Sequence, residues 1–344
     1  MNEKAMFDHF ASRFMAVYRK KIIDKYRTVS DLQRLQTLLQ TNDFARSIYG
    51  MSQNLCTKYD SDAWQASVLD TIDLDTIYTN VEAVEGTPED YVDRLVKELL
   101  RYFKKDFFRW CNKPDCRHCS SPGEQMTPVG HQPPNDEERP YDCGVVEVYQ
   151  CSNCKHLTRF PRFNHPVKLL ETRSGRCGEW CNLFMLLLKS FGIEARYIWN
   201  REDHVWCEFY STNLKRWVHV DSCEQSFDEP HIYSVNWNKK MSYAIAFNNT
   251  GVVDVSKRYI IQNQLTRDQI SEQDLVYLLE TVTKRLRAGL GDHDLYKLAC
   301  RDEQEKLGWA TVSDDSTPTK TGSSLKGRES GSADWKNQRG EDGT

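Results

Sequence analysis

Two Cys-x-x-Cys pairs limit how this chain can fold more than any other feature of its sequence. They are Cys116/Cys119 and Cys151/Cys154, with 31 residues between the pairs. Each pair forms a tight turn that points two sulfurs at one ion, and four thiolates complete the tetrahedral shell of a structural zinc. We therefore predict one structural Zn²⁺ in a Cys₄ knuckle, with no coordination position open to a substrate. The predicted ligands are Cys116, Cys119, Cys151 and Cys154.

The gap between the pairs is longer than in most zinc ribbons. Residues 120–144 are rich in Pro, Gly and charge, so a long loop accounts for the extra length. Polar neighbours such as Arg117 and Ser152 argue against four unrelated core cysteines. Four other side chains remain alternative ligands, namely Cys111, His118, Cys143 and His156.

A further cysteine, Cys177, stands in the sequence Ser-Gly-Arg-Cys-Gly-Glu-Trp, at the start of a predicted helix. Residues 177–191 are apolar on nearly every face, which indicates a buried helix, and Gly192 is a typical helix stop. The unpaired amides and positive dipole end of a first helical turn favour an anion. Cys177 is therefore a candidate thiolate nucleophile, whereas Cys181, one turn deeper, is expected in the core.

Three strand candidates follow at 195–199, 204–210 and 216–221. His204 begins the second strand, 27 residues after Cys177, and Asp221 ends the third strand, 17 residues later. A cysteine, a histidine and an aspartate so placed predict a nucleophile, a base and the carboxylate that orients the base. Alternation along 204–210 predicts one core face and one cleft face. The core face has Val205, Cys207 and Phe209, and the cleft face has His204, Trp206, Glu208 and Tyr210.

Length and composition limit the number of domains, the partners and the cell compartment that we expect for this protein. The chain has 344 residues, 39% of them hydrophobic, enough for one large or two ordinary domains. A net charge of -4 gives no reason to expect nucleic acid as a partner. The N-terminus lacks the apolar stretch of a signal peptide, and the longest aliphatic run, 183–188, is too short to span a membrane. We expect a cytoplasmic and possibly also nuclear protein, in which the 12 cysteines stay reduced.

Three segments resemble the peptide:N-glycanases of the transglutaminase-like superfamily, in their short, fungal-type form. They read SGRCGEWCN at 174–182, DHVWCE at 203–208 and WVHVDSCE at 217–224, and the upstream Cys-x-x-Cys pairs match too. The resemblance runs from about residue 95 to residue 259. It implies an α+β fold with a transglutaminase-like (papain-like cysteine-hydrolase) core, in which a buried helix packs against an antiparallel sheet.

We expect the following organisation along the chain. An N-terminal amphipathic helix occupies 1–30, a helical region 31–110, the zinc-binding knuckle 111–165, the transglutaminase-like catalytic core 166–265, C-terminal helices 266–310 and a disordered tail 311–344. The first helix places Phe7, Phe10 and Phe14 at helical spacing, so it either packs on the core or binds a partner. The tail is predicted from its Ser, Thr, Gly and Asp content.

The resemblance implies a deglycosylating amidase acting in ER-associated quality control. It would cleave the β-aspartylglucosamine bond of misfolded N-glycoproteins through a thioester on Cys177, releasing the glycan and leaving aspartate. His204 would carry the proton and Asp221 would orient the imidazole. By analogy with the superfamily, Trp110 would donate its indole N–H to the oxyanion.

The same resemblance implies a glycan site and a protein partner. Glu224 matches a substrate-contacting position of the family. Carboxylates, guanidinium groups and aromatic faces suit a sugar, which makes Glu208, Trp206, Arg196 and Trp237 candidates as well. The terminal helices of the short form dock a ubiquitin-receptor shuttle protein that delivers substrates to the proteasome.

Two alternative classes remain. One is a catalytically silent transglutaminase-like scaffold, which would tend to lose the cysteine that is present here at position 177. The other is a cysteine protease or crosslinking transglutaminase. The short interval from Cys177 to His204 disfavours a papain-type protease, whose histidine lies some 130 residues beyond its cysteine.

Overall fold

The computed structural model describes residues 3–28, 31–311 and 327–343, which form two compact units. The helical unit comprises the described residues of Met1–Thr57, Ala246–Asp254 and Thr266–Thr321. The sheet unit comprises those of Lys58–Ile245, Val255–Leu265 and Gly322–Thr344. These units interleave in sequence and cut across the domain ranges expected above. Within the described ranges, no helix is long and apolar enough to cross a membrane.

The helical unit is organised by a buried arginine. Its helices are α1 (Glu3–Arg27), α2 (Leu32–Thr41), α3 (Asp43–Leu55), α10 (Glu272–Leu286) and α11 (Asp292–Thr311), with strand β11 (Gly251–Asp254). Arg287, at the end of α10, pairs with Asp302 of α11 at 2.7 Å and donates to the hydroxyl of Tyr26 on α1 at 2.8 Å. A buried guanidinium needs such partners, so this residue joins three helices of the unit.

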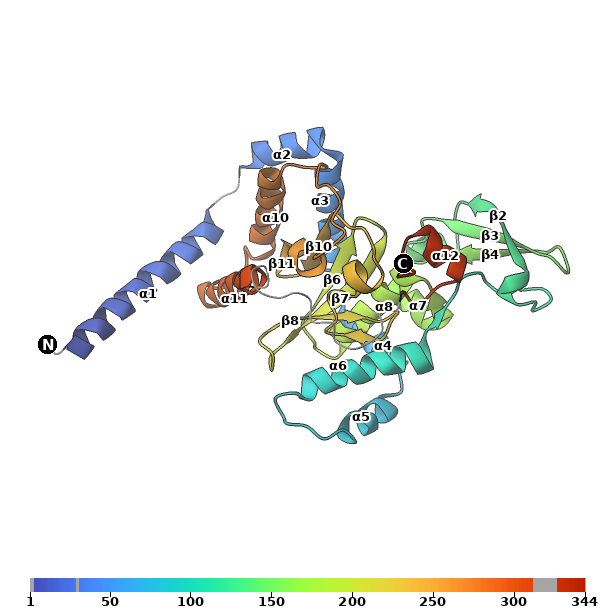
Figure 1. Ribbon diagram of the computed structural model, residues 1–344, viewed down its shortest axis with the longest axis horizontal. Coiled ribbons are helices and arrows are strands. Elements are labelled where there is room, and N and C mark those ends of the chain that lie inside the picture. Colours follow the sequence, from blue (N-terminus) through green and yellow to red (C-terminus); the bar gives the residue numbers. More distant parts are fainter. Residues whose placement is uncertain (1–2, 29–30, 312–326, 344) are drawn as a thin grey trace. The chain divides into compact units, whose positions relative to one another are not determined.

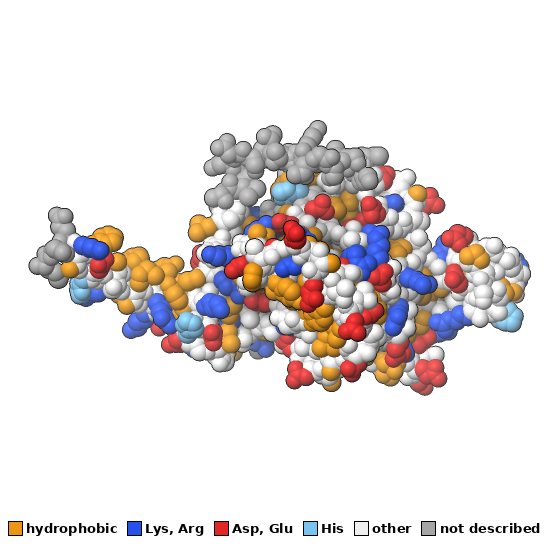
Figure 2. Space-filling view, turned by 90° about the horizontal axis from the view of Figure 1, so that it is seen from below, with side chains coloured by type: hydrophobic (Ala, Val, Ile, Leu, Met, Phe, Trp, Pro, Cys, Tyr) orange, Lys and Arg blue, Asp and Glu red, His pale blue; other side chains and the backbone are white. Residues whose placement is uncertain are grey.

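The predicted N-terminal amphipathic helix is present as α1. Its C-terminal half contacts α11, where Arg19 lies 5.3 Å from the ring centroid of Tyr296. Its N-terminal half leaves Phe7, Phe10 and Phe14 exposed, at 72%, 62% and 67% of their surface. Figure 2 shows this run of apolar side chains along the helix.

The sheet unit is built on a buried helix, α8 (Cys177–Ser190), as the sequence predicts. Gly192 follows it at φ +68°, in the left-handed conformation that suits glycine at a helix end. The helices around it are α4 (Asp62–Leu69), α5 (Leu74–Glu82), α6 (Tyr91–Tyr102), α7 (Pro166–Thr172) and the short α9 (Ser256–Tyr259). Phe184 of α8 is fully buried and meets Phe103 edge to face at 5.4 Å.

An antiparallel sheet lies against α8. Strands β6 (Ala195–Asn200), β7 (His204–Ser211), β8 (Arg216–Asp221) and β9 (Ser226–Phe227) are consecutive neighbours in the order β11-β10-β6-β7-β8-β9, where β10 is Ala244–Asn248. The three predicted strands are therefore confirmed. The Sγ atoms of Cys181 on α8 and Cys207 on β7 lie 3.6 Å apart. This contact confirms both cysteines as core residues.

A second sheet has three strands in the order β2-β3-β4 (Figure 1), and of the four predicted ligand cysteines only Cys151 lies on it, at the end of β3. Its strands are β2 (Met126–Gln132), β3 (Val146–Cys151) and β4 (Leu157–Pro161). A two-stranded parallel pair, β1 (Arg109–Trp110) and β5 (Ser174–Gly175), sets Trp110 opposite Gly175. It therefore brings the segment before the knuckle to the residues just before Cys177.

One expectation about the tail is wrong for the residues that the structure describes. Residues 327–343 form an ordered segment with a short helix, α12 (Ala333–Gln338), inside the sheet unit. Composition predicted disorder because the segment has few apolar residues. Its order depends instead on a few buried charged side chains, with Arg328 and Glu341 at 1% and 0% exposure. Residues 312–326 of the predicted tail lie outside the described residues.

Candidate active site

The first turn of α8 is fixed by ion pairs and hydrogen bonds. Arg176 is the N-cap residue, and its backbone N–H donates to the Glu179 carboxylate at 3.0 Å. Its guanidinium donates to both oxygens of Glu147 on β3, at 2.8 and 2.7 Å. It also donates to the backbone oxygens of Cys111 and Asn112, at 3.2 and 3.0 Å. These contacts hold Cys177 in place in the first helical turn.

Cys177 is a partly exposed residue whose thiol lies in buried surroundings. Burial raises its pKa above the ordinary thiol value, while the nearby guanidinium of Arg328 opposes that rise. The helix N-terminus favours the thiolate, because unpaired amides point toward it. Cys177 therefore needs a proton acceptor before it can act as a nucleophile at neutral pH.

His204 and Asp221 form the pair that the sequence predicts. His204 Nε2 and Asp221 Oδ2 are 2.9 Å apart, and both side chains are buried. Asp221 is held in turn by the Tyr233 hydroxyl at 3.0 Å and by the backbone N–H of Cys223 at 2.9 Å. With Nε2–H donating to the carboxylate, His204 Nδ1 keeps its lone pair. This Nδ1 is buried and has no hydrogen-bond partner among the described atoms.

Helix α8 and strand β7 bring the thiol and the imidazole into one neighbourhood. The helix and the strand contact each other one turn further in, at Cys181 and Cys207. Arg328 acts electrostatically on both Cys177 and His204. Burial lowers the pKa of His204 well below its usual value, and the positive charge of Arg328 lowers it further. The unpartnered Nδ1 is thus a neutral acceptor suited to take the Cys177 proton.

Tyr233 belongs to this site although the sequence did not reveal it. Its hydroxyl bridges Asp221 and the ring of His219, whose Nε2 lies 2.7 Å away. It lies in a short π-helical turn, Ile232–Asn236, whose sequence has no hydrophobic periodicity from which the turn could be predicted. Glu179 carried a readable signal, because a glutamate three residues after a helix N-cap is typical of a capping box.

Glu208, Arg196 and Trp206 occupy a different place from the one predicted. Glu208 is fully buried, ion-paired with Arg196 and 3.5 Å from Arg258, and Tyr259 donates to it. Burial alone would raise the pKa of Glu208, but the two guanidinium groups outweigh it and hold that pKa below the usual value. Trp206 is 1% exposed and packs on Tyr233, with ring centroids 4.3 Å apart.

The structure thus places these three residues in packed surroundings rather than on an open cleft, and their glycan-binding role stays a prediction. Both faces of β7 are covered, so the expected cleft face is a second core face. Trp237 and Glu224 differ from them, because the chain's own segment 327–343 covers them. Arg328 lies 5.0 Å from the Trp237 ring centroid, and Glu224 accepts the backbone N–H of Glu329 at 2.8 Å. Their predicted role in glycan binding also stays a prediction.

Trp110 remains a candidate oxyanion donor. Its pairing with Gly175 places it two residues from Cys177 across the β1–β5 ladder. The indole N–H donates to Asn112 Oδ1 at 2.8 Å, so this donor is already engaged in the structure. A substrate oxygen would have to replace Asn112 as its acceptor.

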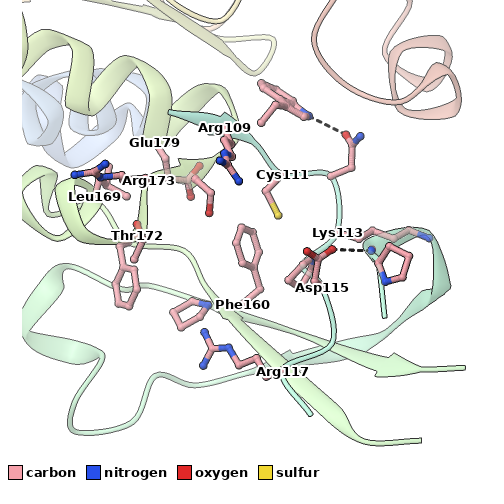
Figure 3. A pocket seen from close by; sticks show the side chains of 18 of the residues that line it. Arg109, Cys111, Lys113, Asp115, Arg117, Phe160, Leu169, Thr172, Arg173 and Glu179 are labelled. Carbon is pink, nitrogen blue, oxygen red and sulfur yellow. Dashed lines mark hydrogen bonds between the residues drawn. The ribbon is translucent and has the colours of Figure 1, made fainter. Parts of the chain in front are cut away.

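A hollow lies between the knuckle and the α7–α8 region, next to Trp110. Its volume is about 1220 Å³, and Figure 3 shows Arg109, Arg173 and Glu179 on one side and Asp115 and Arg117 on the other. The lining carries both charge signs and the ring of Phe160. Its mixed character suits a polypeptide more than a purely apolar ligand.

The four predicted ligand cysteines come together. Their Sγ atoms all lie within 4.8 Å of one another, with Cys116–Cys154 at 3.5 Å and Cys119–Cys151 at 3.6 Å. Zinc–sulfur bonds of about 2.3 Å in a tetrahedron place sulfurs about 3.8 Å apart, so this group fits such an ion. In each turn the residue after the second cysteine is left-handed, with φ +55° at Ser120 and +62° at Lys155. Among the described residues, the metal-competent group contains only these four cysteines.

Known proteins resemble this chain along nearly its whole length. Residues 134–222 match the transglutaminase-like superfamily, and residues 199–289 match the Rad4 transglutaminase-like domain. The chain is 58% identical to the peptide-N(4)-(N-acetyl-beta-glucosaminyl)asparagine amidase of Saccharomyces cerevisiae, over 98% of this chain and 97% of that protein. The protein of the same name from Kluyveromyces lactis is 56% identical over 97% of both chains.

A plant protein and a solved structure are more distant. The Arabidopsis thaliana protein of the same name is 43% identical over 76% of this chain, a match that spans 36% of that longer protein. A crystal structure of Rad4–Rad23 crosslinked to undamaged DNA covers 80% of this chain at 13% identity, with a TM-score of 0.44. A likeness this low carries no argument about function.

The variant Glu208→Gln tests the structural role of the buried carboxylate. It leaves two buried guanidinium groups without their counter-charge, so the free energy of unfolding should fall by about 3–5 kcal/mol in urea denaturation at neutral pH. The folded pKa of Glu208 is depressed, so its ionised form stabilises the fold above the unfolded pKa of about 4.3. This stabilisation is lost as the pH falls through the folded pKa, so the penalty of the variant should shrink there.

Glu171→Gln is the matched control, since that carboxylate is 60% exposed and pairs with Lys168 at the surface. Its effect should stay within about 0.5 kcal/mol. A Glu208→Gln variant with unchanged stability but a raised KM for a glycopeptide would instead support a role for Glu208 in glycan binding.

Proposed function

Since the chain belongs to the peptide-N(4)-(N-acetyl-beta-glucosaminyl)asparagine amidase family, we propose that Cys177, His204 and Asp221 carry out its deglycosylating reaction. Cys177 is the nucleophile, His204 the base and then the acid, and Asp221 the group that orients the imidazole. One observation carries this assignment. His204 is bonded through Nε2 to Asp221, while its buried Nδ1 is free to receive the proton of a thiol held at a helix N-terminus.

In the first step His204 Nδ1 takes the proton of Cys177, and the sulfur attacks the side-chain amide carbon of the glycosylated asparagine. A C–S bond forms and the carbonyl oxygen becomes an oxyanion, for which Trp110 is the proposed donor. The C–N bond then breaks. The nitrogen leaves on the glycan as an amine, carrying the proton that His204 returns.

In the second step water hydrolyses the thioester. His204 takes a proton from the water, whose oxygen attacks the same carbon; the C–S bond then breaks and His204 returns the proton to the departing sulfur. The released polypeptide carries aspartate in place of the asparagine. Asp221 stabilises the imidazolium in both steps, and the Tyr233 hydroxyl keeps the carboxylate aimed at Nε2.

The central prediction concerns the thiol. Cys177→Ala should lower the rate of glycan release from a denatured glycoprotein by about 10³-fold or more, because removing one member of a catalytic unit removes most of its effect. Cys300→Ala is the matched control, a partly exposed cysteine of the helical unit that should keep full activity. Release is followed by the freed glycan together with the Asn-to-Asp mass change. An active Cys177→Ala variant would refute the mechanism.

We propose that the ion at the four cysteines is one structural zinc. Four soft thiolates suit Zn²⁺ and leave no coordination position for substrate. The ion would fix the ends of β3 and of the segment before β2. From there Glu147 of β3 reaches Arg176 beside the nucleophile. The knuckle would thus support the active site without taking part in the chemistry.

Cys119→Ser tests the metal. It removes a ligand at the knuckle surface, so zinc content should fall from about one per chain to a small fraction, since structural zinc binding depends on the whole ligand set. The thermal transition should fall with it, whereas Cys300→Ser should change neither. Purified wild-type protein without stoichiometric zinc, measured by atomic emission, would contradict the assignment.

We further propose that α1 docks a ubiquitin-receptor shuttle protein and that the enzyme acts in the cytosol or nucleus on misfolded glycoproteins. The exposed stripe of Phe7, Phe10 and Phe14 supports this, because its i, i+3, i+7 spacing suits a helix bound in an apolar groove. Among the described residues, α11 contacts the C-terminal half of α1, and the stripe on the N-terminal half stays exposed.

The double variant Phe10→Asp/Phe14→Asp tests the partner proposal. It should weaken binding to a purified shuttle protein by about 100-fold, since two apolar anchors are lost. In cells it should slow glycan removal from a misfolded secretory protein recovered in the cytosol, while activity on a free glycopeptide stays unchanged. Ser12→Asp, on the opposite face of α1, is the control. Equal binding by both variants would rule out this surface.

A further inference from the structure

The C-terminal segment 327–343 lies over the catalytic groups within the sheet unit. Figure 1 shows α12 between the β2-β3-β4 sheet and α7, and Ser332 and Asp334 line the same hollow as Trp110. Such a position needs an explanation, because a tail of this composition gains little from apolar burial.

The segment closes on itself through a buried ion pair. Arg328 and Glu341 are 2.7 Å apart with both side chains at 0% exposure, and their backbones are joined by a 2.8 Å hydrogen bond from Arg328 N–H to Glu341 O. Lys239 of the sheet unit also pairs with Glu341, at 2.6 Å. Charges buried this deeply hold only when they are paired, so the segment is anchored at both of its ends.

Its anchors lie beside two of the proposed catalytic residues, His204 and Asp221. Arg339 pairs with Asp203, the neighbour of His204. Glu224, three residues after Asp221, accepts the backbone N–H groups of Glu329 and Ser330 at 2.8 and 3.2 Å. The Ser332 N–H also donates to Asn112, the acceptor of the Trp110 indole, at 3.1 Å. The segment thus makes polar contacts with Asp203, Glu224 and Asn112.

Aromatic residues complete the cover. Trp335 packs edge to face on Trp110, with ring centroids 5.6 Å apart. The Arg328 guanidinium lies 5.2 Å from the Trp110 ring centroid and 5.0 Å from that of Trp237. Trp237 in turn packs on His204, at 5.2 Å between centroids. The segment therefore covers Trp110, Glu224 and Trp237, residues proposed to meet the substrate.

Two glycines are required by the closed conformation of the segment itself. A Cβ at position 327 would lie 2.1 Å from the Asp342 carbonyl oxygen, so only glycine allows this backbone approach. Gly331 has φ +97°, and a Cβ there would meet the Trp335 ring at 2.6 Å. A segment that merely trailed over the surface would not require either residue.

We propose that the surface beside the catalytic residues that carries Trp110, Glu224 and Trp237 is a polypeptide-binding surface whose resident ligand is the chain's own segment 327–343, which must leave before a glycoprotein can enter. The inference rests on the proposed amidase function of this site. An intramolecular ligand acts at an effective concentration near the millimolar range, so weak contacts are enough to keep the site covered. Substrate or a partner that competes for Glu224 and the tryptophans would uncover it.

The covered state also accounts for the neutral forms of Cys177 and His204. The buried surroundings raise the pKa of Cys177 and lower that of His204, so both groups stay neutral. Departure of the segment would return water to the thiol. It would also remove Arg328, which disfavours the imidazolium.

Alkylation of Cys177 by iodoacetamide, read by mass spectrometry, tests the cover without any substrate. Gly327→Val and Arg328→Ala in the full chain, and a chain ending at residue 326, should each accelerate alkylation about tenfold or more as the open fraction rises. Loss of the Arg328 charge alone would raise the thiol pKa and slow the reaction, so acceleration reports uncovering. Gln338→Ala, an exposed side chain of α12, is the control and should match wild type.

A synthetic peptide of residues 327–343 should protect Cys177 again when added to the shortened chain, whereas a scrambled peptide should not. In the glycopeptide assay the uncovered variants should lower KM several-fold with little change in kcat. Equal alkylation rates in all forms would overturn the proposal. If no form releases glycan but the alkylation difference persists, the proposed function fails and the cover stands.

Discussion

The start of α8 is the constraint on which the rest of the site depends. Arg176 and Arg162 are bound between two carboxylates, Glu179 of α8 and Glu147 of β3, at distances of 2.5 to 2.9 Å. Burial would raise the pKa of Glu147, but hydrogen bonds from Arg176 and Tyr149 outweigh it and set that pKa at about 2. These ion pairs join the first turn of α8 to the knuckle sheet, so Cys177 cannot shift without disturbing that sheet. This network connects the strand that ends at Cys151 to the position of Cys177.

Local sequence signals were sufficient to predict the buried helix that begins at Cys177, the His204–Asp221 pair and the cluster of four cysteines. A continuous apolar run marks α8 because a buried helix has no polar face, and Gly192 marks its end. His204 and Asp221 could be predicted because antiparallel strands joined by short turns must lie side by side. The two Cys-x-x-Cys turns could be predicted because their geometry is local, even though a long loop separates them.

Contacts made by distant segments could not be predicted in this way. Alternation along β7 divides its residues correctly into two faces, but only the packing of Tyr233 and Tyr259 shows that the second face is buried too. Alternation alone therefore assigns Glu208 to a cleft face. The ordered structure of 327–343 could not be predicted for a similar reason. Composition reports how few apolar residues the segment has, but not that Arg328 and Glu341 are buried as a pair.

The central claim is that the glycosylated asparagine becomes joined to Cys177 during turnover. Rapid acid quenching of the full-length enzyme with a glycopeptide, followed by mass spectrometry of the Cys177 peptide, tests it most directly. The account predicts a thioester that carries the peptide but no glycan, and that disappears on treatment with hydroxylamine. Glycan release that proceeds with no adduct on Cys177, or an adduct that still carries the glycan, would contradict it.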